Sequence, residues 1–451
     1  MEYTDYYFIG IGGIGMSAIA RYFKHQGFRV SGYDKTPSPL TARLESEGIQ
    51  IHYEDDVDAI PKDVERTFVI YTPAVPADMK ELEYVFRNGY TVVKRSRALG
   101  EISRGQECLA VAGTHGKTTT STLLAHILTE SGEGCNAFLG GISKNYDTNL
   151  LLSRNKVLVA EADEFDRSFL QLYPHIAVIT STDADHLDIY NDRSHMLEAF
   201  GKFASQVDED GAVIIKKGVE VPQEGIKAKT YRYSYKEVCD FYASDIEESS
   251  EGGAFEFTLN WPGGRMEKCK VGIPGWVNVE NAVAASAVAL LHGTSAEDIK
   301  KALASFSGVK RRFDIHVNRP DVAYIDDYAH HPNEIKAAIS SIREIFPGRR
   351  LCGIFQPHLY SRTRDFAGDF ADALSGLDVL VMLPIYPARE EPIPGVCSEI
   401  IFDKVKAGEK YLTDKEHLMD TLKEHRTDCI VTFGAGDIDR FIDRIEKWLN
   451  E

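Results

Sequence analysis

Residues Cys108–Leu124, CLAVAGTHGKTTTSTLL, decide how the chain folds. The apolar run Cys108–Ala112 predicts a buried strand. Apolar residues at helical spacing from about Lys117 predict a helix, so that Gly113 opens a loop between the two. In a loop of this kind, backbone N–H groups surround an anion and the helix N-terminus adds its positive dipole. The stretch therefore predicts a phosphate-binding loop.

The residues of this loop carry the chemistry of a nucleotide site. The core Gly-Lys-Thr-Thr is present, although the first glycine of G-x-x-x-x-G-K-[ST] would fall at Val111. Lys117 would place a point charge on a terminal phosphate, and the Thr118 hydroxyl would bind the Mg²⁺ that accompanies it. A purely structural strand–turn–helix connection is the alternative. Because strand, loop and helix occur together, we predict an ATP site formed by Gly113, Thr114, His115, Gly116, Lys117, Thr118 and Thr119.

Size and composition limit the class of protein. A chain of 451 residues should hold two to four domains, and 43% hydrophobic with 27% charged residues is typical of a globular protein. The net charge of −18 argues against nucleic-acid binding. The chain has no run of eighteen apolar residues and begins without the features of a signal peptide, which predicts a cytoplasmic protein that does not enter membranes. The seven cysteines show no C-x-x-C spacing, so neither zinc nor disulfides are expected.

The N-terminal region shows a second glycine-rich turn. Gly10, Gly12 and Gly15 fit G-x-G-x-x-G after a strand, and Asp34 follows the next strand, Phe28–Gly32, where a ribose-binding acid is expected. The pattern indicates that a pyrophosphate approaches this backbone without saying whose pyrophosphate it is. A turn without a ligand is the structural alternative.

Charged residues also follow two strands of the middle region. Lys156–Ala160 runs into Glu161 and its acidic neighbours, and His175–Thr180 runs into a segment that ends in His186. Carboxyl ends of parallel strands meet at one edge of a sheet, so Glu161 is expected opposite Lys117 as a second Mg²⁺ ligand, with His186 as a further ligand. A structural histidine is the alternative. Asn278 and Asn281, three apart on a predicted helix, could share a ligand or simply cap that helix.

The C-terminal part again alternates helices and strands, which predicts a third doubly wound domain. It follows three consecutive cations, Lys310–Arg312, for which a solvated charge run is the default interpretation. Its strand ends carry the polar segments Asp326–Pro332, Gln356–Arg364 and Gly434–Asp437. We therefore predict an α/β protein of three domains, 1–105, 106–308 and 309–451.

Seven segments, in this order, carry a resemblance that spans essentially the whole chain: GIGGIGMSAIA, GTHGKTTT, EADEFDRSFL, DADHLDIY, VKRRFD, DDYAHHPNE and FQPHLYSRTRDF. Together they resemble the Mur ligases. The resemblance implies a Rossmann-like domain for a UDP-sugar, a central phosphate-loop domain for ATP, and a mobile Rossmann-like C-terminal domain. It also implies the ATP-dependent joining of an amino acid to UDP-N-acetylmuramate in peptidoglycan synthesis, through an acyl phosphate. The segments around Glu164 and Leu359 look closer to the alanine-adding branch, so L-alanine is the expected amino acid.

The resemblance also implies roles for single residues. The first glycine turn would serve the UDP diphosphate rather than a nicotinamide dinucleotide, and ATP would bind with Mg²⁺, expected as two ions. Val277 stands where His is common, and Leu359 replaces an Arg found in some relatives. The implied catalytic residues are Lys117, Glu161, His186, Arg312 and Asp327; the metal ligands Thr118, Glu161 and His186; the additional ATP contacts Asn278, Asn281, Arg312 and Asp327; the UDP-sugar contacts Gly10, Gly12, Gly13, Gly15, Met16 and Asp34; and the amino-acid contacts His358 and Arg362. The amine would lose its proton to His186 or a nearby carboxylate.

Three other functions compete with this interpretation. A murein tripeptide recycling ligase or a folylpolyglutamate synthetase shares the phosphate loop but uses another acceptor. An NAD-dependent oxidoreductase would use Gly10–Gly15 and Asp34 but would give Lys117 and Thr118 no role. A non-catalytic nucleotide sensor is the third.

Overall fold

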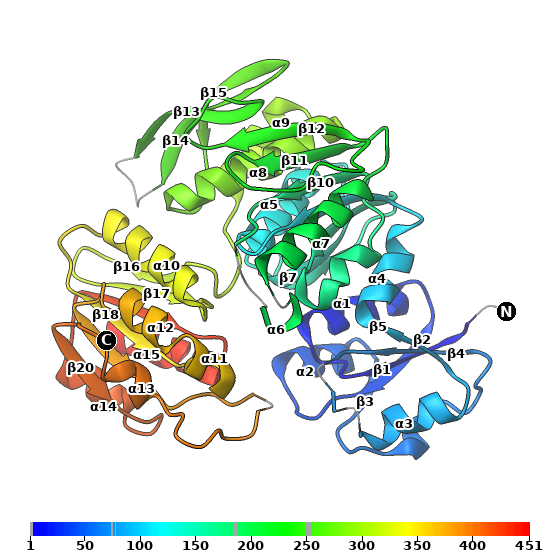
Figure 1. Cartoon of the computed structure of the whole chain (residues 1–451), viewed down its shortest axis with the longest axis horizontal. Coiled ribbons are helices and arrows are strands. Elements are labelled where there is room, and N and C mark those ends of the chain that lie inside the picture. The colour runs from blue at the N-terminus through cyan, green and yellow to red at the C-terminus, as the bar shows by residue number, and fades with distance from the viewer. Residues whose placement is uncertain are drawn as a thin grey trace. The chain divides into compact units, whose positions relative to one another are not determined.

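The computed structural model describes residues 3–73, 75–76, 78–183, 187–190, 192–248, 254–388 and 390–451 (Figure 1). The described residues form three β-sheets, and the chain divides into two compact units. The sheets of the N-terminal and middle regions share one unit, and the other unit consists mainly of Gly308–Glu451. In the described residues, no helix has the length and apolar content needed to cross a membrane.

The N-terminal sheet has five parallel strands in the order β3-β2-β1-β4-β5, a doubly wound arrangement. Its central strand β1 is almost entirely buried because helices cover both faces. Its elements are β1 (Asp5–Ile9), α1 (Ile14–His25), β2 (Arg29–Tyr33), α2 (Pro39–Ser46), β3 (Gln50–His52), η1 (Val57–Ala59), β4 (Thr67–Tyr71), α3 (Lys80–Arg87), β5 (Thr91–Lys94) and α4 (Arg95–Ser103).

The middle sheet has ten strands in the order β15-β14-β13-β12-β11-β10-β6-β9-β7-β8. The phosphate-loop strand β6 lies inside it, between β10 and β9, and both pairings are parallel. Its elements are β6 (Glu107–Ala112), α5 (Lys117–Glu130), β7 (Asn136–Ser143), β8 (Thr148–Leu151), β9 (Val157–Ala162), η2 (Phe165–Gln171), β10 (Ile176–Ile179), α6 (Leu187–Tyr190), α7 (Arg193–Ser205), β11 (Ala212–Lys216), β12 (Lys229–Ser234), β13 (Phe241–Glu248), β14 (Phe255–Trp261), β15 (Gly264–Lys270), α8 (Trp276–His292) and α9 (Ala296–Ser305).

The two sheets of the first unit are joined by helix α1, which also packs on β7 and β8 of the middle sheet. Arg21 donates from Nη1 to Thr148 Oγ1 (2.8 Å), and Asn149 donates from Nδ2 to the Ile14 carbonyl (2.6 Å). Strands β13, β14 and β15, of which β14 and β15 form an antiparallel hairpin, extend the middle sheet to the green edge at the top of Figure 1.

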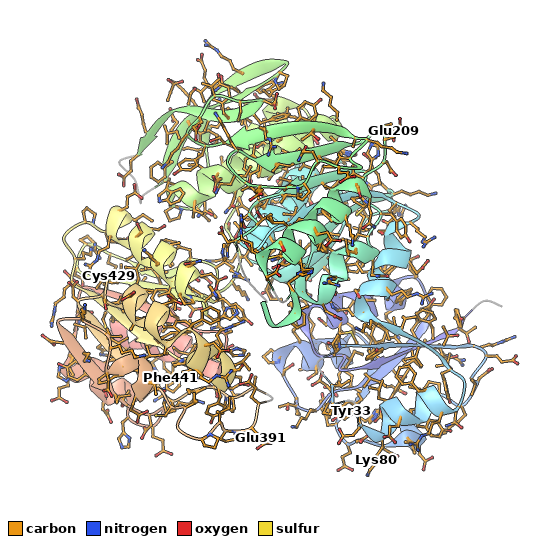
Figure 2. All side chains as sticks on the ribbon, viewed as in Figure 1. Tyr33, Lys80, Glu209, Glu391, Cys429 and Phe441 are labelled. Carbon is orange, nitrogen blue, oxygen red and sulfur yellow. The ribbon has the colours of Figure 1, made fainter. Side chains whose placement is uncertain are left out.

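The C-terminal sheet has six strands in the order β16-β17-β21-β18-β19-β20, and only β16 runs antiparallel to its neighbour. Cys429 and Phe441, both labelled in Figure 2, belong to two separate hydrophobic clusters of this unit. Its elements are β16 (Asp314–Asn318), β17 (Ala323–Asp327), α10 (Pro332–Ile345), β18 (Leu351–Phe355), α11 (Tyr360–Asp365), α12 (Ala367–Leu374), β19 (Val379–Met382), α13 (Glu399–Phe402), β20 (Glu409–Leu412), α14 (Leu418–Glu424), β21 (Cys429–Phe433), η3 (Asp437–Phe441) and α15 (Ile442–Asn450).

Candidate functional site

The phosphate loop connects β6 to α5 as predicted, and its two glycines hold backbone that other residues rarely adopt. Gly113 has φ +132° and Gly116, which precedes the helix, has φ +80°. A Cβ on Gly113 would lie 2.1 Å from Thr180 Oγ1, so the loop also needs the space. These glycines let the chain turn sharply at the carboxyl end of a strand that is buried from Cys108 onward.

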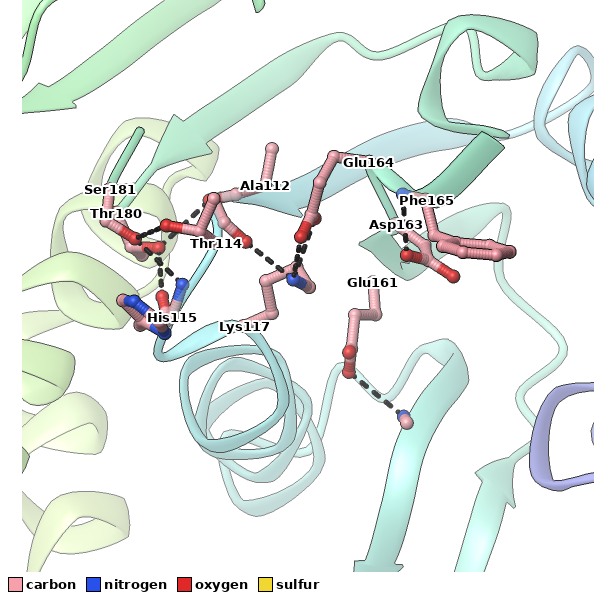
Figure 3. Close-up of polar contacts among 12 residues, drawn as sticks. Ala112, Thr114, His115, Lys117, Glu161, Asp163, Glu164, Phe165, Thr180 and Ser181 are labelled. Atoms are coloured by element: carbon pink, nitrogen blue, oxygen red, sulfur yellow. Dashed lines mark hydrogen bonds and ion pairs between the residues drawn. The ribbon is translucent and has the colours of Figure 1, made fainter. Parts of the chain in front are cut away.

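The end of strand β10 braces the loop (Figure 3). Ser181 Oγ accepts the His115 N–H (2.8 Å) and lies 2.9 Å from Thr114 Oγ1, while the Ser181 carbonyl accepts the Thr114 N–H (3.2 Å). Because the first amides of a helix have no intrahelical acceptor, those of α5 are the ones offered to an anion. Only the acidic character of this strand end was visible in the sequence, whereas the bracing role of Ser181 was missed.

Three carboxylates lie near the ammonium of Lys117. Its Nζ donates to both oxygens of Glu164 (3.0 and 2.7 Å) and to the Gly113 carbonyl (2.6 Å). Burial acts to lower the pKa of Lys117, but the carboxylates of Glu164, Asp163 and Glu161 outweigh it and hold that pKa above its usual value. Lys117 is therefore a permanent cation at the start of α5. Glu164, one of the acidic residues after β9, was not recognised as its partner from the sequence.

Glu161 and Thr118 form an oxygen pair beside this lysine. Strand register places Val111 opposite Glu161, so the ends of β6 and β9 coincide. Thr118 Oγ1 donates to Glu161 Oε1 (3.1 Å), and Glu161 Oε2 accepts the Gly140 N–H (3.1 Å). A hydroxyl and a carboxylate are hard oxygen donors of the kind that Mg²⁺ binds. His186, the other predicted ligand, lies outside the described residues.

The two predicted asparagines of α8 are both buried. Asn281 Oδ1 accepts from Thr120 Oγ1 (3.2 Å), and a Cβ on Gly116 would lie 3.0 Å from the same oxygen. The structure thus places Asn281 against the phosphate loop. Asn278 donates from Nδ2 to the Pro274 carbonyl (2.6 Å), which fastens the start of its helix.

The N-terminal glycine turn follows β1 and leads into α1, whose N-cap is Gly13. Gly10 has φ +87°, and Gly12 lies so close to Asp34 that its N–H donates to Asp34 Oδ2 (2.7 Å). Asp34 therefore shapes the turn, in addition to any contact that it makes with a ligand. Met16 is only 1% exposed as a whole residue and belongs to the hydrophobic core, and its contact with the UDP-sugar stays a prediction.

In the C-terminal unit, Asp327 ends β17 and its carboxylate is held by backbone. Its oxygens accept the N–H groups of Phe313 (2.8 Å) and Ala329 (2.7 Å). Burial raises the pKa of Asp327 to about 6, with the Arg312 charge opposing that rise. The Arg312 guanidinium lies 5.0 Å from the centre of the Tyr328 ring. Asp327 and Arg312 are thus neighbours in one electrostatic cluster.

The cation run Lys310–Arg312 is not simply a solvated charge run. Arg311 has φ +62°, and its side chain is 18% exposed. Its Nε donates to the fully buried Asp326 (3.1 Å), and Nη2 donates to the Gly434 carbonyl (2.6 Å). The default interpretation was therefore wrong for Arg311, because its guanidinium pairs with a buried carboxylate on β17, fifteen residues further along the chain.

His358 lies in the turn after β18, and Arg362 lies in α11, the short helix that follows it. Leu359, between them, has φ +71°, and its N–H donates to the Tyr386 carbonyl (3.0 Å). The rings of His358 and Tyr386 stack with centroids 5.8 Å apart. Within the described residues, the buried Nη1 of Arg362 has no hydrogen-bond partner. A buried guanidinium nitrogen without an acceptor suits an anionic ligand.

Fold and loop together define a phosphate-loop α/β protein with a glycine-rich turn on a separate doubly wound sheet. Three family models match the chain: "Mur ligase family, catalytic domain" over residues 5–107, "Mur ligase middle domain" over residues 111–289, and "Mur ligase, glutamate ligase domain" over residues 311–436. The chain belongs to the Mur ligase family, whose members are ATP-dependent. The membership confirms the predicted three-domain α/β fold and removes the oxidoreductase as a competing class.

Curated relatives are similar over their full length. The UDP-N-acetylmuramate–L-alanine ligase of Parabacteroides distasonis is 52% identical over 99% of this chain and 97% of its own. That of Porphyromonas gingivalis is 51% identical over 98% of each. The crystal structure of UDP-N-acetylmuramate-alanine ligase MurC from Thermotoga maritima has a TM-score of 0.82 at 29% identity, covering 98% of this chain and 99% of that one. MurF ligase from the same organism, solved with ADP, shares the fold with a TM-score of 0.62 at 17% identity over 88% and 97% of the two chains.

Proposed function

We propose that this chain joins L-alanine to the lactyl carboxylate of UDP-N-acetylmuramate, converting ATP to ADP and phosphate, as a cytoplasmic step of peptidoglycan synthesis. Full-length identity of 51–52% to proteins named for that reaction supports the choice of substrates. The structural observation that carries it is the contact of Thr118 with Glu161 at the shared end of β6 and β9, beside Lys117, whose ammonium pairs with Glu164.

The chemistry follows from the poor reactivity of a carboxylate. Phosphoryl transfer from ATP converts the lactyl carboxylate to an acyl phosphate, and the amine of alanine then attacks that carbon and expels phosphate. Lys117 and the first amides of α5 would neutralise the charge that moves between the phosphoryl oxygens. Water would destroy the acyl phosphate, so the reaction needs a site from which water is excluded.

The residues around Thr118 fit a magnesium ion. Thr118 and Glu161 would hold it, and the bound ion would neutralise phosphate charge. The second ion and the contribution of His186 remain predictions. So do the roles of Arg312 and Asp327 toward ATP, and the domain limits 1–105, 106–308 and 309–451.

The amino acid would be bound by the C-terminal unit. Arg362 would pair with its carboxylate, since a guanidinium offers two parallel N–H groups to such a ligand. The Nη1 atom of Arg362, buried and without a partner among the described residues, supports this role. His358, three residues past the end of β18, would complete the same side of the site.

Phosphate release with ATP, Mg²⁺ and UDP-N-acetylmuramate, measured across amino acids and the murein tripeptide, tests the proposal. We expect release that requires both the UDP-sugar and L-alanine. Release with the tripeptide but not with alanine would assign the recycling activity instead. Release without any acceptor, or none with alanine, would overturn the proposal.

A further inference from the structure

We propose that Arg95 holds the diphosphate of the UDP-sugar, together with the glycine turn; this inference rests on the proposed function. Arg95 is the first residue of α4, directly after the edge strand β5. A Cβ on Gly15 would lie 2.9 Å from Arg95 Nη1 and 3.2 Å from its Cδ. The guanidinium therefore lies directly against the second residue of α1.

Two positive features meet at this point. Gly15 belongs to the first turn of α1, a helix of twelve residues whose first amides have no intrahelical acceptor. Arg95 adds a full charge in a chain whose net charge is −18. A guanidinium beside free amides matches a diphosphate, because its planar fork gives two parallel hydrogen bonds to phosphate oxygens. The close approach of the Arg95 side chain is therefore a second reason, besides the turn, why glycine stands at position 15.

Asp163 orients this guanidinium. Arg95 Nη2 lies 3.3 Å from Asp163 Oδ2, and Asp163 Oδ1 accepts the Phe165 N–H (3.1 Å), a bond drawn in Figure 3. Within the described residues Asp163 is the one polar partner of the Arg95 side chain, which leaves Nη1 for a ligand. Asp163 lies between Glu161 and Glu164, so one short segment contacts both Arg95 and the phosphate-loop residues. Arg95 thus binds the substrate, and Asp163 is a positioning residue.

A purely structural role for the Arg95–Asp163 pair is the competing explanation, and the chain contains a matched control for it. The preceding residue, Lys94, pairs with Asp166 at 2.7 Å, so it joins the same two segments by a shorter contact. Lys94 does not belong to the glycine turn at Gly10–Gly15. A structural role predicts that loss of either cation has the same effect, whereas diphosphate binding predicts that only Arg95 matters for the nucleotide.

The test measures binding of UDP, uridine and UDP-N-acetylmuramate to the full chain by calorimetry, for wild type, Arg95→Met, Arg95→Lys and Lys94→Met. We expect Arg95→Met to weaken UDP and UDP-N-acetylmuramate by about 10- to 100-fold, the cost of a lost charge-assisted hydrogen bond. Uridine should be unaffected. Arg95→Lys should bind UDP with an affinity between those of wild type and Arg95→Met, because it keeps the charge and loses the planar fork of the guanidinium. Lys94→Met should bind like wild type.

Steady-state kinetics distinguish a loss of UDP-sugar binding from a general structural defect. Arg95→Met should raise KM for the UDP-sugar while KM for ATP changes less than about twofold, and Asp163→Asn should shift the UDP-sugar KM in the same direction by a smaller factor. Equal losses in Arg95→Met and Lys94→Met, or unchanged UDP affinity in Arg95→Met, would overturn the inference. If wild type binds UDP but forms no product with alanine, the proposed function fails while the UDP measurements still decide the role of Arg95.

Discussion

Replacement of Lys117 by Met should remove turnover and weaken the fold at the same time. The side chain of Glu164 is 1% exposed, and both of its oxygens accept from Lys117. Without the ammonium, Glu164 becomes a buried carboxylate with its charge uncompensated. Loss of one partner of a buried ion pair costs about 3–5 kcal/mol. Loss of one preorganised charge-stabilising donor reduces kcat by about 10²–10³-fold.

The two effects can be separated with a second change at the partner. Lys117→Met/Glu164→Gln removes the buried charge as well as the lysine, so it should recover most of the lost stability. Turnover should not return, because the phosphoryl oxygens still lack their cation. Glu164→Gln alone leaves Lys117 in place and serves as the matched control for the stability cycle.

Urea unfolding followed by circular dichroism gives the free energies, and phosphate release gives the rates. Wild-type turnover in Lys117→Met would refute the catalytic role of the lysine. A double variant no more stable than Lys117→Met would refute the buried ion pair as the source of the stability loss.

Arg362→Ala should raise KM for L-alanine by about 10- to 100-fold, as expected for a lost charge-assisted bond, whereas the exposed Arg364→Ala should not; equal KM values in steady-state assays would contradict the assignment. Burial lowers the pKa of His330 to about 4 from 6.5, so its contribution to stability is complete above pH 6.5 and is lost as pH falls toward 4. Relative to His330→Gln, wild type should therefore lose about 3 kcal/mol over that interval, and parallel curves of unfolding free energy against pH would exclude this. Gly113→Ala forces a contact of 2.1 Å and strains a φ of +132°, so it should lower Tm and weaken ATP binding, while Gly105→Ala, with nothing within 4 Å, should do neither in scanning calorimetry and nucleotide titration.

Local sequence was sufficient for the elements around the phosphate loop. The predicted strand Cys108–Ala112 and a helix from Lys117 match β6 and α5 closely, because a short apolar run and a glycine break are local signals. The alternation of helices and strands in the C-terminal part does not show that residues 360–374 form two helices, α11 and α12, with a break at Phe366. The short strands β16 and β20 were not predicted, since each is half-polar and pairs only with one neighbour.

Partners across the sheets could not be predicted in the same way. Glu161 was expected opposite the phosphate loop because parallel strand ends coincide, and Thr118 does contact it. Glu164 as the partner of Lys117, and Asp163 as the partner of Arg95, depend on how a turn of a few residues points each carboxylate. The sequence does not distinguish neighbouring acidic residues, because their partners depend on the direction in which the backbone points each side chain.

The sequence by itself determined the class of this protein: its phosphate loop, its glycine turn and its alternating strands and helices are encoded in residues close together along the chain. Only the tertiary structure decided which charges meet. Side-chain pairing depends on strand order and register, which bring residues dozens of positions apart within a few ångströms of each other. A local sequence pattern does not show which of these residues become neighbours.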